Sequence, residues 1–205
     1  MDPIRQYYMF YCATPSDINE HMPTLNSYAL QCDHVTECGV RGAVSSYAFA
    51  NALAGRPGTR MIGVDLETNG NVTRFLEHAK SVGLDAIFYQ QSDLSCPMEP
   101  TDLLFIDTWH IYGHLKRELA RWNGMVRKYI LLHDTTVDGV HGESVRECIK
   151  MNWDLNEQSR STGIPLEEIV KGLWPAVTEF LAAHPEWVLE KRYENNNGLT
   201  VLRRV

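Results

Sequence analysis

The 205-residue chain lacks several features that would assign it to a particular class of protein. It contains no run of about 18 apolar residues, so we expect no membrane insertion. Its first residues show no basic segment followed by an apolar one, so we expect no signal peptide. Basic residues are fewer than acidic ones, 19 against 26, and the net charge of −7 argues against a nucleic-acid partner.

Cysteine is sparse and shows no pairing pattern. The five cysteines have irregular spacing, and no two of them are separated by only two residues. An odd number of thiols in such an arrangement favours reduced cysteines in a reducing compartment. We therefore expect a cytoplasmic protein. The proportions of hydrophobic residues (44%) and charged residues (22%) are those of a soluble globular domain.

Apolar segments alternate with helical ones along most of the chain, and this pattern predicts βαβ units and a parallel sheet. We expect one α/β domain over residues 1–205, with a helical segment at 1–30 packed on it. The Asn-Gly pair at 197–198 predicts a final antiparallel hairpin, so the fold class is a doubly wound, mostly parallel seven-stranded sheet. The predicted strands are 34–38, 60–65, 85–89, 103–107, 129–133, 187–193 and 199–204. The predicted helices are 16–30, 43–53, 71–81, 112–122 and 165–183, the last broken near Trp174-Pro175.

Ionisable residues follow every predicted parallel strand. Because the carboxyl ends of parallel strands meet at one edge of a sheet, where ligands bind, we expect these side chains to form a site. The residues concerned are Glu37, Asp65, Asp93, Asp107 with His110, and His133 with Asp134.

The turn after the first strand contains Gly39 and Gly42, which would let the backbone approach a ligand at a helix N-terminus. A third glycine is missing, so the dinucleotide fingerprint is absent, and a plain turn is the alternative. Asp65 ends the second strand, where a carboxylate can accept hydrogen bonds from ribose hydroxyls. The alternative for Asp65 is a helix cap.

The ends of the fourth and fifth strands offer two carboxylates and two imidazoles. Asp107, His133 and Asp134 could bind a divalent ion or orient a substrate hydroxyl, or they could cap local turns. The ordinary pKa of His110 suits proton abstraction at neutral pH. His114 is expected to be solvated. Trp109 either stacks on a ligand or packs in the core.

These residues together resemble the class I S-adenosylmethionine-dependent methyltransferases. In that family the first strand ends in an acidic residue before a glycine-rich turn, as in Glu37-Cys38-Gly39-Val40-Arg41-Gly42. A second acidic residue ends strand two, and the last hairpin is antiparallel. The resemblance implies that S-adenosylmethionine is bound by Glu37, Gly39, Arg41, Gly42, Ser45, Asp65, Leu66, Ser92, Asp93 and Asp107.

A narrower resemblance covers the segments 105–110, 114–119 and 132–135. They are similar to the branch that holds rhamnosyl O-methyltransferases and cephalosporin-hydroxylase-like proteins, which implies a sugar acceptor such as rhamnose in a glycan. In that branch the strand-four aspartate and an acidic pair after strand five bind a divalent metal such as Mg²⁺. Asp107 and Asp134 match those positions, whereas His133 replaces a carboxylate. The segment 17–21 resembles methyltransferase domains of chlorovirus glycan-synthesis proteins, which would place this chain in a host cytoplasm.

The predicted function is therefore methyl transfer to a hydroxyl of a small molecule or oligosaccharide. His110 is the predicted base, with Asp107, Asp134 and His133 beside it; a metal at Asp107 and Asp134 is the alternative. A small phenol as acceptor, a hydroxylase-like or nicotinamide enzyme and a non-catalytic binding protein are further alternatives. The oligomeric state, including a homodimer, is left open.

Overall fold

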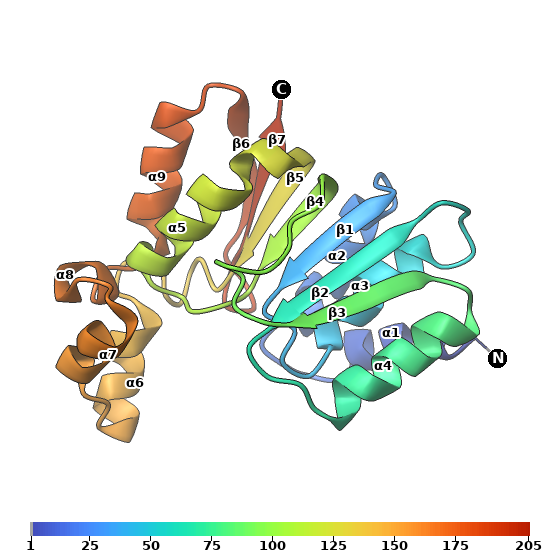
Figure 1. Ribbon diagram of the computed structural model, residues 1–205, viewed down its shortest axis with the longest axis horizontal. Coiled ribbons are helices and arrows are strands. Elements are labelled where there is room, and N and C mark those ends of the chain that lie inside the picture. The colour runs from blue at the N-terminus through green and yellow to red at the C-terminus, as the bar shows by residue number, and fades with distance from the viewer. Residues whose placement is uncertain (1) are drawn as a thin grey trace.

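A computed structural model describes residues 2–205 as a sheet with helices on both faces (Figure 1). Within these residues seven strands lie in the order β3-β2-β1-β4-β5-β7-β6. β1 to β5 pair in parallel, whereas β7 runs antiparallel to both β5 and β6. The predicted fold class is confirmed. The strands are β1 (His34–Cys38), β2 (Arg60–Asp65), β3 (Asp85–Gln90), β4 (Thr101–Ile106), β5 (Val126–His133), β6 (Trp187–Tyr193) and β7 (Leu199–Arg204).

Two hydrophobic clusters hold helices on opposite faces of the sheet. The first four helices pack on one face, and α5 and α9 pack on the other. α6, α7 and α8 lie together at the left of Figure 1, beyond α5. The helices are α1 (Pro3–Ala13), α2 (Met22–Ala29), α3 (Val44–Leu53), α4 (Gly70–Ser81), α5 (Tyr112–Trp122), α6 (Glu143–Met151), α7 (Leu155–Thr162), α8 (Leu166–Ile169) and α9 (Leu173–Ala183), with 3-10 turns at Asn19–His21 and Asn123–Met125.

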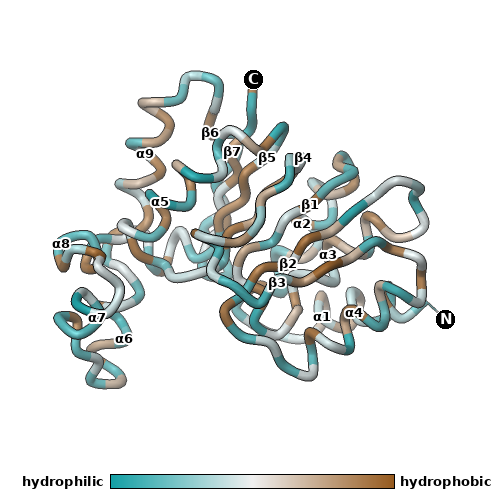
Figure 2. Tube along the Cα trace, viewed as in Figure 1, coloured by the Kyte–Doolittle hydropathy of each residue, from teal (hydrophilic) through white to brown (hydrophobic). Residues whose placement is uncertain are grey.

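The central strand β4 is buried along its whole length, as expected for a parallel strand covered on both faces. Leu103 and Phe105 join the cluster under α1 to α4, while Leu104 and Ile106 join the cluster under α5 and α9. Figure 2 shows hydrophobic stretches along the strands in the middle of the molecule. Burying each such side chain stabilises the fold by about 1.5–3 kcal/mol. The buried strand β4 therefore fixes the position of the polar residues that follow it.

The helices after β5 differ from the prediction. α6 and α7 were not predicted. α6 buries only Ser144 and α7 buries no side chain, so neither helix contributes an apolar side chain to the buried core. The expected break near Trp174-Pro175 lies earlier, between the end of α8 and the start of α9. Pro175 sits in the first turn of α9, where its missing N–H removes no helical hydrogen bond.

The N-terminal segment is joined to the final hairpin. His21 Nε2 lies 2.9 Å from the carbonyl oxygen of Asn195, and the Glu20 N–H donates to Asn196 Oδ1 at 3.0 Å. Asn196 and Asn197 adopt positive φ, as the hairpin turn requires. α1 and α2 bury side chains in the same cluster as α3. No helix within residues 2–205 has the length and apolar character to cross a membrane.

Candidate active site

Two adjoining cavities open where the parallel strands end. The large cavity has a volume of about 720 Å³ and lies beyond the carboxyl ends of β1 to β4. The small cavity has a volume of about 260 Å³ and extends toward the end of β5. Both are lined by Gly39, Arg41, Asp107 and Thr108, so these four residues form their common border.

The turn after β1 is held against the end of β4. Gly39 has φ +87°, and a Cβ atom there would lie 2.0 Å from the carbonyl oxygen of Asp107. Only glycine therefore allows this approach. The Asp107 N–H donates to the Cys38 carbonyl at 2.8 Å, which fixes the same contact from the other side. The turn thus sets the position of Asp107 between the cavities.

Asp65 lines the large cavity and also orders the glycine turn. Its Oδ2 accepts hydrogen bonds from the N–H groups of Val40 at 2.8 Å and Arg41 at 2.7 Å. Asp65 does not cap the next helix, because Asn69 accepts the hydrogen bonds at the start of α4. One carboxylate therefore connects the end of β2 to the turn after β1.

His110 lies among four carboxylates. Its Nε2 is 3.1 Å from Asp107 Oδ1, and its Nδ1 is 3.2 Å from Asp134 Oδ2, 3.4 Å from Glu143 Oε2 and 3.5 Å from Asp138 Oδ2. Burial alone would lower the pKa of His110, but the surrounding carboxylates, first Asp107, outweigh burial and hold it well above its usual value. The surrounding carboxylates therefore favour the protonated form of the His110 imidazole in this arrangement.

Asp107 also contacts a second imidazole. His133 Nδ1 lies 3.2 Å from Asp107 Oδ1. Burial would raise the pKa of Asp107, but the charge of His133 and the hydrogen bonds from both imidazoles hold it well below its usual value. Burial would lower the pKa of His133, but Asp107 raises it to about 10. Asp107 is therefore an ionised carboxylate between two cationic groups.

The cluster has the donors of a divalent-cation site. Asp107, His110 and Asp134 each offer one ligand atom, and these atoms lie within 4.8 Å of one another. Two buried atoms of the cluster, His110 Nδ1 and Asp134 Oδ1, have no hydrogen-bond partner within residues 2–205. The short contact between His110 Nδ1 and Asp134 is thus an ion pair without hydrogen-bond geometry. Two carboxylates and one imidazole suit a divalent cation.

The structure brings most of the predicted site residues to these cavities, with two exceptions. Glu37 is fully buried and accepts hydrogen bonds from Ser45 and Ser46. His133 is also buried and reaches the site only through Asp107 and Asp134. The large cavity is lined by Gly39, Arg41, Asp65, Leu66, Ser92, Asp93 and Asp107, and the small cavity by Gly42, Ser45, His110 and Asp134.

The expectation that His114 is solvated was wrong. Its side chain is 12% exposed, and its Nε2 lies 3.2 Å from Asp93 Oδ2. Glu118, four residues further along α5, was missed, although helical spacing places it on the face of His114. Asp138 and Glu143 were missed because they follow β5 in a region with no predicted element. Both lie within 3.5 Å of His110 Nδ1.

The comparison with known proteins rests on structure. No family model and no curated protein matches the sequence. A Corynebacterium glutamicum protein matches with a TM-score of 0.63 and 15% identity, over 100% of this chain and 91% of that one. The chain shares the fold of known methyltransferases. The O-methyltransferase TomG of Streptomyces achromogenes, solved with S-adenosylmethionine, has a TM-score of 0.61 and 14% identity over 100% and 91% of the two chains.

A third match is an O-methyltransferase of Bacillus cereus, solved with S-adenosylhomocysteine. Its TM-score is 0.57 and its identity 12%, over 98% of this chain and 90% of that one. Identities this low establish a common fold.

Proposed function

We propose that this protein is an S-adenosylmethionine-dependent O-methyltransferase that methylates a sugar hydroxyl, with rhamnose in a glycan as the expected acceptor. The observation that carries the proposal is the pair of cavities that meet at Asp107. Methyl transfer needs two ligands whose reacting atoms face each other across a narrow border. Two adjoining cavities with one common wall provide that arrangement.

The large cavity suits the methyl donor. Its volume of about 720 Å³ is typical of a site for a nucleoside-sized ligand. Asp65 has a free lone pair for ribose hydroxyls beyond its contacts to the glycine turn, because each carboxylate oxygen can accept two hydrogen bonds. Ser92 lines the same cavity and offers a polar side chain to a base. Gly39 lets the backbone pass close to the donor at the border.

The small cavity suits a neutral, hydroxyl-rich acceptor. Its lining includes the carboxylates of Asp17, Asp107, Asp134 and Glu143. Carboxylates accept hydrogen bonds from hydroxyl groups and repel anions. Among the described residues, no Phe, Tyr or Trp lines this cavity, so a flat phenol would find no aromatic ring to stack on. This composition favours a sugar over a phenol.

The acceptor hydroxyl must lose its proton as it attacks, and the cluster offers two routes. A divalent cation, held by Asp107 and Asp134 with His110 as third donor, would lower the pKa of that hydroxyl. In the metal-free route His110 takes the proton, which requires a neutral imidazole. The raised pKa of His110 opposes that state at neutral pH. A cation held by the carboxylates of Asp107 and Asp134 would displace the imidazole proton of His110 on binding, so we favour the cation, reversing the preference drawn from the sequence.

The proposal is tested first by ligand choice. Thermal shift with S-adenosylmethionine, S-adenosylhomocysteine and NAD(P) should show stabilisation by the first two only. The protein is then incubated with the donor and with one of two acceptors, a methyl rhamnoside or catechol. Mass spectrometry identifies the methylated products. Methylation of the rhamnoside supports the proposal. Methylation of catechol alone would replace the sugar by a phenol, and stabilisation by NAD(P) alone would indicate a nicotinamide enzyme.

A further inference from the structure

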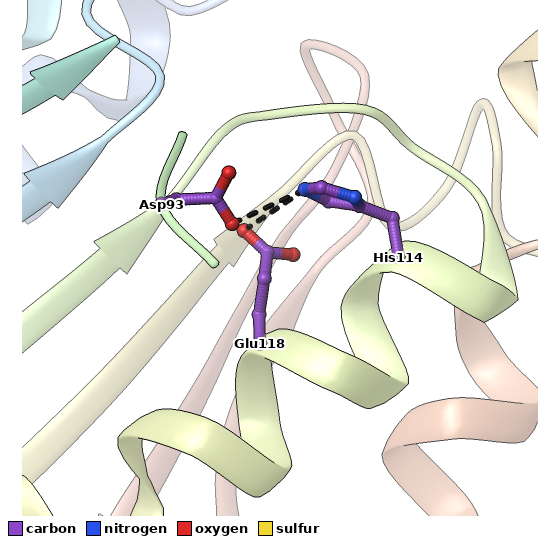
Figure 3. Close-up of side chains that lie close together, drawn as sticks. All are labelled: Asp93, His114 and Glu118. Carbon is purple, nitrogen blue, oxygen red and sulfur yellow. Dashed lines mark hydrogen bonds and ion pairs between the residues drawn. The ribbon is translucent and has the colours of Figure 1, made fainter. Parts of the chain in front are cut away.

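A second group of ionisable side chains lies beside the large cavity, away from His110. Asp93 comes from the loop after β3, and His114 and Glu118 come from one face of α5 (Figure 3). His114 Nε2 lies 3.2 Å from Asp93 Oδ2 and 3.9 Å from Glu118 Oε1. The methyl transfer described above assigns no role to His114 or Glu118.

The Glu118 carboxylate is buried with an unsatisfied oxygen. The residue is 1% exposed, and its Oε2 has no hydrogen-bond partner within residues 2–205. Its Oε1 accepts a hydrogen bond from Thr108 Oγ1 at 2.7 Å. A buried polar group without a partner costs about 1–3 kcal/mol, and a cation bound by the Glu118 carboxylate would offset that penalty.

We propose that Asp93, His114 and Glu118 bind a divalent transition-metal ion such as Zn²⁺, separate from any cation at Asp107. The three ligand atoms lie within 4.8 Å of one another. Ligands about 2.1 Å from a tetrahedral Zn²⁺ are about 3.4 Å apart, between the two separations measured from His114 Nε2.

The donor set selects the class of metal. One imidazole nitrogen and two carboxylate oxygens suit Zn²⁺ and its neighbours in the first transition row, whereas Mg²⁺ prefers oxygen ligands. The Thr108 hydroxyl orients Glu118, as outer-shell partners of metal ligands do. Asp93 and His114 line the large cavity, which gives an ion a path to the site. Three protein ligands leave one position open for water or a ligand.

The bound ion would tie the loop after β3 to α5 and so brace one wall of the large cavity. This inference stands independently of the proposed methyl transfer, because its readout is zinc bound per chain rather than activity. Zn²⁺ titrations against a chromophoric chelator are carried out on the wild type and three variants. Glu118→Gln removes a ligand of this cluster, Asp134→Asn removes a ligand of the other cluster, and Glu77→Gln changes an exposed glutamate on α4.

Glu118→Gln should lose one equivalent of zinc, or weaken its binding by more than about ten-fold, while Asp134→Asn and Glu77→Gln keep that equivalent. The proposal is overturned if Glu118→Gln binds zinc as the wild type does, or if Asp134→Asn abolishes all binding. Should Glu118→Gln fail to fold, wild-type crystals soaked in Zn²⁺ give the answer. An anomalous peak between the three side chains supports the site, and its absence there rejects it.

Discussion

The Nε2 atom of His110 lies 3.1 Å from Oδ1 of Asp107, so the imidazole and carboxylate that follow β4 form an ion pair. The pair stands at the border between the two cavities, because Asp107 lines both. The short distance between His110 and Asp107 agrees with the prediction that these two residues act together. The surrounding carboxylates nevertheless raise the pKa of His110, and this favours an ion pair, or a metal ligand once a cation displaces the imidazole proton, over a free base.

Removing the Asp65 carboxylate should weaken donor binding. Asp65→Ala loses a charged acceptor for ribose hydroxyls, worth about 1.5–3 kcal/mol, and so should raise the Kd of S-adenosylmethionine about ten- to hundred-fold. Calorimetry with donor and with acceptor measures the difference, and acceptor affinity should change less. Glu67→Ala, an exposed carboxylate two residues away, is the matched control. Unchanged donor affinity in Asp65→Ala would remove this residue from the site.

Chelation separates the two routes for the acceptor proton. After exhaustive treatment with a chelator, methyl transfer should fall by about 10²-fold or more, since the cation is expected to supply several kcal/mol of charge stabilisation. Added Mg²⁺ or Mn²⁺ should restore it in the wild type and fail to do so in Asp134→Asn. Full turnover in the chelator would instead favour His110 as the base, and His110→Ala would then be inactive while still binding both ligands.

Gly39 should be intolerant of a side chain. The Cβ atom of an alanine at this position would clash with the carbonyl oxygen of Asp107, and its positive φ would be strained. We expect the free energy of unfolding to fall by about 3–5 kcal/mol. Gly55→Ala is the matched control, because Gly55 also has positive φ but nothing lies within 4 Å of its added Cβ. It should cost only about 1–2 kcal/mol. Chemical denaturation measures the free energy of unfolding of both variants. Equal losses of stability would show that the contact with Asp107 is unimportant.

Glu37 should make stability depend on pH. Burial raises its pKa from 4.5 to about 8, so the folded state keeps a proton that the unfolded state releases. The free energy of unfolding should therefore fall as pH rises from about 5 to about 8, by an amount on the order of a few kcal/mol. Glu37→Gln cannot titrate and should flatten this dependence in denaturation curves, whereas Glu67→Gln should not. An unchanged slope in Glu37→Gln would assign the effect to other groups.

Glu37 also shows what the sequence could and could not predict. The bounds of β1, β2, β6 and β7 were predicted as observed, because buried strands and an Asn-Gly turn leave direct patterns. The position of Glu37 at a strand end was clear as well. The sequence could not show that its side chain is fully buried against Ser45 and Ser46 and lines neither cavity, since that depends on tertiary packing.

The carboxylates around His110 illustrate a different limit. Asp107 and Asp134 were predicted because they end neighbouring strands of a parallel sheet. Asp138 and Glu143 reach His110 from the loop after β5 and the start of α6, where no periodic pattern marked an element. Glu118 could have been found, because it lies one helical turn from His114 on a predicted helix. The periodicity of the sequence thus locates the ends of strands. It does not predict which residues of a later loop fold back over those ends.

The central claim is that the two cavities carry out methyl transfer across Asp107. It is tested most directly by incubating the protein with methyl-labelled S-adenosylmethionine and a methyl rhamnoside, and by counting label in the sugar product. The account predicts time-dependent labelling by the wild type and a fall of about 10²-fold or more in Asp107→Asn, which should still bind the donor. No labelling by the wild type with divalent cation present, or equal labelling by Asp107→Asn, would contradict it.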